Sequence, residues 1–284
     1  MAILEEVIFV EDTEIKHINE LKFWAGKAEQ EGLLENHFYE KFYVSDFNIS
    51  REDFKDKRIL DIGCGPRGSL EWADMASLRI GLDPLVNEYY KLNGGTLLHK
   101  MSYVRGYSED MPFPDEMFDF VFSINSLDHV DDLDETVSEM KRVLKVGGIC
   151  GIIVDANHKP HLLEPITIDL NLKNNFLDVC EVIEERVYET VYKTGFRDNL
   201  DDPTFYDFDN EKVRPAILLL KLKKVKEYDV EHDKIPKKDA NAYNNLFKEN
   251  KKLKKENKQL KKEIKAFKNR KVVRIVDKLK SGKK

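Results

Sequence analysis

A glycine-rich turn with an acid at its head is the part of this sequence best suited to bind a nucleotide. The segment Arg58-Ile-Leu-Asp-Ile-Gly-Cys-Gly-Pro-Arg-Gly68 passes from apolar and β-branched residues into three glycines. This pattern predicts a strand, a tight loop and then a helix over 69–76. Glycines let a ligand approach the backbone closely, and a helix N-terminus favours negative charge. The sequence therefore predicts a nucleotide-like ligand at this turn.

The spacing of the glycines alone leaves the identity of that ligand open. Gly63, Gly65 and Gly68 fit the G-x-G-x-x-G pattern of dinucleotide-binding loops, and Asp83 lies about where a ribose-binding acid falls. Asp61, however, precedes the first glycine by two residues, at the end of the predicted strand. A carboxylate there suits a cofactor with a cationic amino group and a sulfonium, and it repels a pyrophosphate.

Four segments in a fixed order resemble the class I S-adenosylmethionine-dependent methyltransferases of the type 11 family. They lie within roughly residues 55–157: the Asp-x-Gly-x-Gly loop, Gly81-Leu-Asp-Pro84, a Met-Pro-Phe-Pro-Asp-x-x-Phe-Asp stretch from Met111, and Arg142-Val-Leu-Lys-Val-Gly-Gly148. The resemblance implies an enzyme that uses S-adenosylmethionine. It also implies an α/β fold, a doubly wound Rossmann-like sheet of seven strands in which the last strand is antiparallel.

The same resemblance implies roles for individual residues of a cofactor site. The implied cofactor-binding residues are Asp61, Gly63, Gly65, Asp83, Ser108, Glu109 and Asn125. The first three would hold the methionine end of the cofactor, and Asp83 would accept hydrogen bonds from the ribose hydroxyls. Ser108 and Glu109 would lie beside the adenine, although Tyr107 stands where relatives often carry an acid. Asn125 would line the methyl-transfer site.

Two segments at predicted strand ends are rich in residue types that transfer protons, Asn125-Ser-Leu-Asp-His-Val130 and Asp155-Ala-Asn-His-Lys-Pro-His-Leu-Leu-Glu-Pro165. Methyl transfer is an in-line displacement, and a hydroxyl acceptor must also lose a proton. Histidine suits this task because its pKa lies near neutrality. The candidate catalytic residues are His158, His129, Asp128 and Glu164. One histidine would be the base and one carboxylate its partner; alternatively, both histidines only order their loops.

The methyl acceptor is indicated only by a second resemblance. Residues 65–70, 125–130 and 157–165 together resemble segments of uncharacterised methyltransferase-domain proteins that are associated with surface-polysaccharide genes. This resemblance implies transfer to an oxygen or nitrogen of a small molecule or glycan precursor. Arg67 is a further candidate, which would grip the cofactor carboxylate or an anionic acceptor, or else be a loop residue held in a salt bridge.

The elements that must position these residues follow from hydrophobic periodicity. Alternation of apolar segments predicts a doubly wound sheet, with strands near 58–62, 78–82, 102–105, 118–124 and 148–155 and helices near 69–76, 85–92 and 132–144. Two further long strands are expected at 177–190 and 215–226. The expected organisation is 1–54 N-terminal cap helices, 55–228 methyltransferase domain, 229–242 linker, 243–268 coiled coil and 269–284 basic amphipathic tail.

Composition limits the class of protein and its partners. Among 284 residues there is no apolar run long enough to span a bilayer and no signal peptide, and three cysteines show neither pairing nor metal-ligand spacing. We therefore expect a cytoplasmic protein without a bound metal. Residues 240–284 carry 17 basic and 4 acidic groups, hence +13, whereas the other 239 residues carry 30 basic and 49 acidic groups, hence −19. The acidic body argues against a nucleic-acid substrate.

The basic C-terminal segment indicates partners of its own. Over 243–268 a heptad places Tyr243, Asn250, Asn257 and Ile264 at a positions and Leu246, Leu253, Leu260 and Phe267 at d positions. Leucine at d with asparagine at a favours a parallel two-stranded coiled coil and hence a homodimer. Residues 269–284 suit an anionic membrane at its inner face or an acidic partner protein. Two alternatives to the enzyme stay open: a non-catalytic coiled-coil scaffold with a cofactor-binding domain, and an NAD-dependent oxidoreductase, for which no second catalytic domain is evident.

Overall fold

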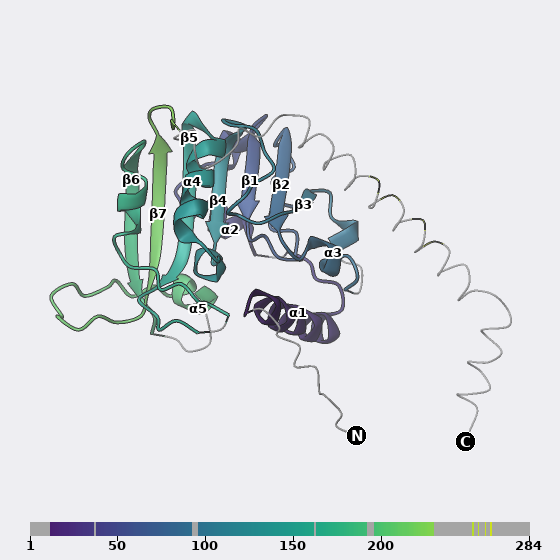
Figure 1. The fold of residues 1–284 in the computed structure, drawn as a ribbon, viewed down its shortest axis with the longest axis horizontal. Helices are drawn as coiled ribbons and strands as arrows, with labels where there is room; N and C mark the ends of the chain where they lie inside the picture. The colour runs from purple at the N-terminus through teal and green to yellow at the C-terminus, as the bar shows by residue number, and fades with distance from the viewer. Residues whose placement is uncertain are drawn as a thin grey trace, which may run out of the picture.

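The computed structural model describes residues 12–36, 38–92, 96–161, 163–191 and 196–229, together with Lys252, Lys255, Gln259 and Lys262. One sheet of seven strands organises this part of the chain, in the order β3-β2-β1-β4-β5-β7-β6 (Figure 1). The strands are β1 (Arg58–Ile62), β2 (Leu78–Asp83), β3 (Ser102–Arg105), β4 (Phe118–Ile124), β5 (Leu144–Ala156), β6 (Cys180–Glu189) and β7 (Ala216–Lys224).

The pairing of the strands confirms the predicted Rossmann-like fold class. β1 to β5 pair in parallel, whereas β7 lies between β5 and β6 and runs antiparallel to both. The order reverses at β1, which begins the sheet in the sequence and lies between β2 and β4. Ligands of open parallel sheets bind beyond the carboxyl ends of the strands at such a reversal.

Alternating residues of each strand supply two apolar layers, one on each face of the sheet. In β1, Leu60 and Ile62 pack into one cluster with the buried face of the helix α4 (Leu133–Val143), while Ile59 packs into the other with Phe54 and Trp72. The helices are α1 (Asp12–Glu31), α2 (Glu40–Tyr43), α3 (Val86–Tyr89), α4 (Leu133–Val143) and α5 (Phe196–Asp201). Four short 3-10 turns accompany them: η1 (Arg51–Phe54), η2 (Thr96–Leu98), η3 (Leu127–His129) and η4 (Leu172–Asn175).

The helix predicted over 69–76 is wrong, because the chain there forms a series of turns. Side chains from other segments take the carbonyl oxygens that a helix would need. Asn36 donates to the carbonyls of Gly68 and Ser69, and Arg79 donates to the next two carbonyls at 3.1 and 2.6 Å. In the described chain, the glycine turn is therefore not followed directly by a helix over 69–76. The helix predicted near 85–92 is present only as the short α3.

Helix α1 lies beyond one end of the sheet, on the same side as α5 (Figure 1). No helix in the described ranges is both long and apolar enough to cross a bilayer. The predicted coiled coil and basic tail lie outside the described residues, except for four positions of 243–268. Those four positions are helical and exposed, and they say nothing about pairing.

Candidate cofactor and methyl-acceptor site

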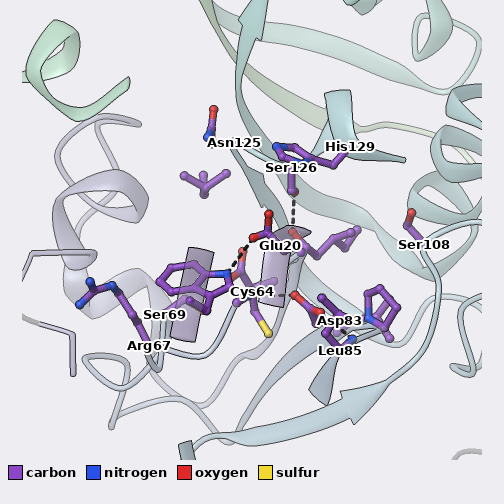
Figure 2. A pocket seen from close by; sticks show the side chains of 18 of the residues that line it. Glu20, Cys64, Arg67, Ser69, Asp83, Leu85, Ser108, Asn125, Ser126 and His129 are labelled. Atoms are coloured by element: carbon purple, nitrogen blue, oxygen red, sulfur yellow. Dashed lines mark hydrogen bonds between the residues drawn. The ribbon is translucent and has the colours of Figure 1, made fainter. Parts of the chain in front are cut away.

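A cavity of about 660 Å³ lies at the carboxyl ends of β1, β2 and β4. The glycine turn after β1 and the residues that follow β4 form two of its walls, and residues of α1 and α5 complete it. Figure 2 shows Asn125, Ser126 and His129 on one side, Asp83 and Leu85 on another, and Glu20 between them. The volume is typical of a site for a cofactor or a small molecule.

Two glycines of the turn are required by their backbone conformation and by their neighbours. Gly63 has a φ of +69°, and a Cβ added to it would lie 2.3 Å from the Cβ of Ser126. Gly65 has a φ of +57°, and a Cβ there would lie 3.2 Å from the ring of Trp24. The turn is therefore closely packed on both sides, and its backbone borders the cavity directly.

Asp61 is buried at the end of β1, and one of its carboxylate oxygens has no hydrogen-bond partner among the described residues. Its Oδ2 accepts hydrogen bonds from the Tyr43 hydroxyl at 2.9 Å and from the Ser69 hydroxyl, whereas Oδ1 is buried and unpaired. Burial raises the pKa of this carboxyl to about 7, although the two hydroxyls oppose that shift. A cationic group in the cavity would satisfy the unpaired oxygen and stabilise its charge.

Asp83 ends β2 and anchors the glycine turn to it. Its carboxylate accepts hydrogen bonds from the backbone N–H groups of Gly65, at 3.1 Å, and Leu85, at 2.9 Å. Burial raises its pKa to about 6, and the two N–H groups oppose the shift. Asp83 also lines the cavity, beside the glycine turn that it anchors.

The residues predicted to lie beside an adenine also line the cavity, but one of them has a structural role. The Glu109 carboxylate accepts hydrogen bonds from Ser108 and from the backbone N–H groups of Asp131 and Asp132. It thereby fixes the chain just before α4. Tyr107 is 42% exposed at the cavity rim and lies beside His17 of α1.

Helix α1 contributes polar and aromatic groups that the sequence did not single out. Trp24 covers Gly65, and its indole N–H donates to Glu20 at 2.7 Å, which directs that carboxylate into the cavity (Figure 2). Glu20 is close enough to raise the pKa of Asp83. The two residues are four apart in a helix, but no motif distinguished this pair from other surface pairs.

Arg67 connects the glycine turn to α1. Its guanidinium donates to the Glu31 carboxylate at 2.7 Å and lies 5.5 Å from the Trp24 ring centre. The structure therefore favours the salt bridge among the roles considered for Arg67, although the side chain also borders the cavity.

The acceptor-side residues meet where β4 and β5 end, because these two strands are neighbours in the sheet. Asn125 follows β4 with a φ of +54°, and its side-chain Oδ1 is buried and unpaired among the described residues. Asp128 and His129 form the turn η3 after it, and His158 and Glu164 come from the loop after β5. The two predicted catalytic segments thus form one cluster.

Four distances describe this cluster. His129 Nε2 lies 3.8 Å from Asp128 Oδ1, and His158 Nε2 lies 3.6 Å from Asp128 Oδ2. His158 Nδ1 lies 3.9 Å from Glu164 Oε2, which His161 Nε2 approaches to 2.7 Å. Since His161 lies between two predicted residues in the sequence, its i, i+3 spacing to Glu164 was a usable signal that was missed.

Burial and like charge shift the pKa values of the cluster. The pKa of Asp128 is raised to about 8 by burial and then by the Glu164 and Asp155 carboxylates. Burial lowers the pKa of His129, so its ring is neutral near pH 7. Among the residues described around the cavity, His129 and Glu164 line it, whereas Asp128 and His158 lie behind them.

The fold and the cavity together define a Rossmann-like domain of the methyltransferase type. The cyclase SpnF, a solved structure, superposes with a TM-score of 0.51 at 16% identity, over 75% of this chain and 96% of SpnF. At that identity the likeness concerns the fold alone.

Residues 60–152 match the family model described as a methyltransferase domain, Methyltransf_11. This part of the chain is a class I methyltransferase domain, which confirms the class predicted from the four segments, and S-adenosylmethionine is the cofactor of that class. The unpaired oxygen of buried Asp61 fits a cofactor that carries a cationic amino group.

Curated relatives match only part of their length. The sterol 24-C-methyltransferase ERG6B of Gibberella zeae is 37% identical over 103 residues, which are 34% of this chain and 27% of that protein. The sterol 24-C-methyltransferase of Yarrowia lipolytica is 31% identical over 160 residues, or 45% of this chain and 41% of that protein. The chain thus spans between about a quarter and two fifths of these relatives.

Proposed function

We propose that this protein transfers the methyl group of S-adenosylmethionine to an oxygen or nitrogen of a small molecule or glycan precursor. The observation that carries the proposal is one continuous cavity. It joins the glycine turn, with Asp61 and Asp83, to the polar cluster at Asn125, His129 and Glu164. Donor and acceptor sites on opposite walls of one cavity are what a direct transfer requires.

The residues present would hold the cofactor at the glycine turn. When bound, S-adenosylmethionine supplies an electrophilic methyl group on a sulfonium. Asp61 would accept hydrogen bonds from the amino group through its unpaired Oδ1, and Asp83 would accept them from ribose hydroxyls. Ser108 and Tyr107 border the part of the cavity assigned to the adenine, and α1 would exclude water by covering Gly65 with Trp24.

The acceptor would lie against Asn125, His129 and Glu164, since these side chains line the cavity. A hydroxyl acceptor would lose its proton to the cluster behind them. His129 is neutral near pH 7 and could take that proton, with the Glu164 carboxylate near enough to stabilise the resulting charge. His158, the other histidine named from the sequence, would act from behind Asp128 and would not contact the acceptor.

A second candidate is C-methylation of a large apolar acceptor such as a sterol. The aromatic part of the cavity wall favours it: Phe23, Trp24, Phe38, Phe42 and Phe196. The named relatives act on sterols, but their match leaves most of their own length uncovered. We therefore place this candidate second.

An assay of S-adenosylhomocysteine release separates the candidates. The full chain is incubated with S-adenosylmethionine and with nucleotide sugars, small amines or sterols, and Asp61→Asn serves as the cofactor-site control. We expect product with a polar acceptor and none from the control. Product only with sterols would favour the second candidate. Cofactor binding without turnover of any acceptor would favour the non-catalytic scaffold, and binding of NADH in its place would favour the oxidoreductase.

We also retain the proposals that concern the C-terminal segment and the location of the protein. Residues 243–268 would form a homodimer, and residues 269–284 would attach a cytoplasmic enzyme to the anionic inner face of the membrane or to an acidic partner. Sedimentation of a chain that ends at Asp239 tests the first proposal, because it should be monomeric. Flotation with anionic vesicles tests the second, since only the full chain should bind.

A further inference from the structure

Asp128 is a buried carboxylate that the described structure leaves unsatisfied. Its side chain is 1% exposed, and neither Oδ1 nor Oδ2 accepts a hydrogen bond from a described residue. Glu164 and Asp155 add negative charge nearby. The ionised form of a buried carboxyl is strongly disfavoured without a hydrogen bond or a counter-charge. A positively charged group that enters the cluster would remove this cost.

The atoms around Asp128 have the spacing of metal ligands rather than of hydrogen-bonded pairs. The imidazole nitrogens of His129 and His158 lie 3.8 and 3.6 Å from its two oxygens, too far for a hydrogen bond. Ligands of a tetrahedral ion, at about 2.1 Å from the metal, are separated by about 3.4 Å. Asp128, His129 and Glu164 each offer one such atom, and the three atoms lie within 4.8 Å of one another.

We propose that Asp128, His129 and Glu164 bind a divalent first-row transition-metal ion, such as Zn²⁺ or Mn²⁺. One imidazole nitrogen and two carboxylate oxygens suit these ions better than Ca²⁺ or Mg²⁺, which prefer oxygen ligands alone. His129 and Glu164 also line the cavity, so the ion would keep an open position toward a ligand. Three protein ligands with one open position are typical of catalytic rather than structural metal sites.

The two other histidines of the cluster would support the ion. His158 Nδ1 contacts the Lys159 carbonyl at 3.1 Å, which holds the ring with Nε2 3.6 Å from Asp128 Oδ2. His158 would thereby fix the position of the Asp128 side chain from behind, as residues around metal ligands do. His161 contacts Glu164 at 2.7 Å and would orient that carboxylate.

A second grouping, His158, His161 and Glu164, also has its ligand atoms within 4.8 Å. Its His161 side chain is 51% exposed, and Glu164 already pairs with that ring. The unsatisfied carboxylate belongs to the first grouping, which we therefore favour as the site. The two groupings share only Glu164, so variants of Asp128, His129 and His161 can tell them apart.

The ion would give the acceptor wall a direct role in the proposed methyl transfer. An acceptor oxygen at the open position would have its pKa lowered, so its proton would leave near neutral pH. Only this role rests on the proposed function. Metal binding itself does not, because it can be measured without cofactor or acceptor.

Titration of the metal-free full chain with Mn²⁺, followed by electron paramagnetic resonance of the free ion, tests the site. Mn²⁺ avoids the three cysteines, since thiolates select softer ions. We expect one ion per chain. Asp128→Asn and His129→Gln should each weaken Mn²⁺ binding at least about 100-fold. Removing a residue that contacts the ion should cost more affinity than the 10- to 100-fold typical of residues that only support a ligand.

Two histidine controls accompany these variants. His17→Gln changes a cavity-lining ring outside the cluster and should bind Mn²⁺ like the wild type. His161→Gln should weaken binding about tenfold or less, as a supporting residue. S-adenosylmethionine binding by each variant reports that the fold is intact.

The proposal is overturned if the wild-type chain binds no Mn²⁺ and no Zn²⁺. It is equally overturned if Asp128→Asn and His129→Gln bind like the wild type. Loss in His161→Gln with retention in His129→Gln would place an ion at the second grouping and also contradict it. Loss of methyl transfer with metal binding intact would count against the proposed function and not against the metal site.

Discussion

Replacing Asp61 with asparagine should weaken cofactor binding while stabilising the empty protein. Burial raises the pKa of this carboxyl from 3.8 to about 7. At about 1.4 kcal/mol per pH unit, the charged form is disfavoured in the empty site by on the order of 4 kcal/mol. The cationic amino group of the cofactor would offset much of this cost, through a charge-assisted hydrogen bond to Oδ1 worth about 1.5–3 kcal/mol.

The effect of Asp61→Asn on cofactor binding and its effect on the stability of the empty protein have opposite signs and different pH dependence. Losing the charged hydrogen bond should raise the Kd for S-adenosylmethionine roughly 10- to 150-fold at pH 8. Below pH 7 the wild-type carboxyl becomes mostly protonated, so wild-type affinity should fall up to about fivefold from pH 7 to pH 6. The asparagine variant should show no such fall. Its weak affinity should be nearly the same at both pH values.

The stability of the empty protein follows from the direction of the pKa shift. Because the folded pKa lies above the unfolded one, the native state holds the proton more tightly between about pH 4 and 7. Wild-type stability therefore declines as pH rises through this window, and the Asp61→Asn variant should escape that decline. At pH 8 its thermal midpoint should be at least that of the wild type.

Isothermal titration calorimetry at pH 6, 7 and 8 measures the affinities, and calorimetric unfolding without ligand measures the stability. Asp74→Asn is the matched control, since Asp74 is an exposed carboxylate paired with Arg51 and lies outside the cavity. Wild-type affinity in Asp61→Asn at pH 8 would refute the role assigned to this carboxylate.

Three further changes test other parts of the account. Gly63→Ala should destabilise the protein by about 2–4 kcal/mol, because the new Cβ has a strained φ and a neighbour at 2.3 Å. Gly147→Ala, with a φ of +84° and open space, should cost only about 1 kcal/mol; equal thermal midpoints would contradict this comparison. Arg67→Ala and Glu31→Ala should be coupled by about 1 kcal/mol in a double-mutant cycle of urea unfolding, since their ion pair is partly buried; additive losses would mean that the pair does not fasten α1. In metal-free protein, burial raises the pKa of Asp128 to about 8. Stability should therefore fall as pH rises from about 4 to 8, and Asp128→Asn should flatten that fall, as measured by thermal unfolding across pH.

The sheet and the glycine turn could be predicted because their signals are local. Strand residues such as Ile59 and Leu60 alternate between the two faces of the sheet. The turn after β1 carries glycines because its backbone adopts positive φ angles, which other residues rarely do. The meeting of Asp128 with His158 was also foreseeable, because both follow strands that a parallel sheet sets side by side.

What could not be predicted depends on partners distant in the sequence. The segment after the turn has helical spacing, but Asn36 and Arg79 occupy its carbonyls. Glu20 enters the cavity only because α1 lies across it, and helical periodicity does not say where a helix docks. Likewise, spacing places His129 and His158 at strand ends without indicating that only the former lines the cavity.

The central claim is that the glycine-turn cavity holds S-adenosylmethionine. Titration calorimetry of the full wild-type chain with S-adenosylhomocysteine, the demethylated product, tests it most directly, since no acceptor is needed. We predict a single saturable site per chain that Asp61→Asn weakens and Asp74→Asn leaves unchanged. The absence of binding by both S-adenosylhomocysteine and S-adenosylmethionine would contradict the claim.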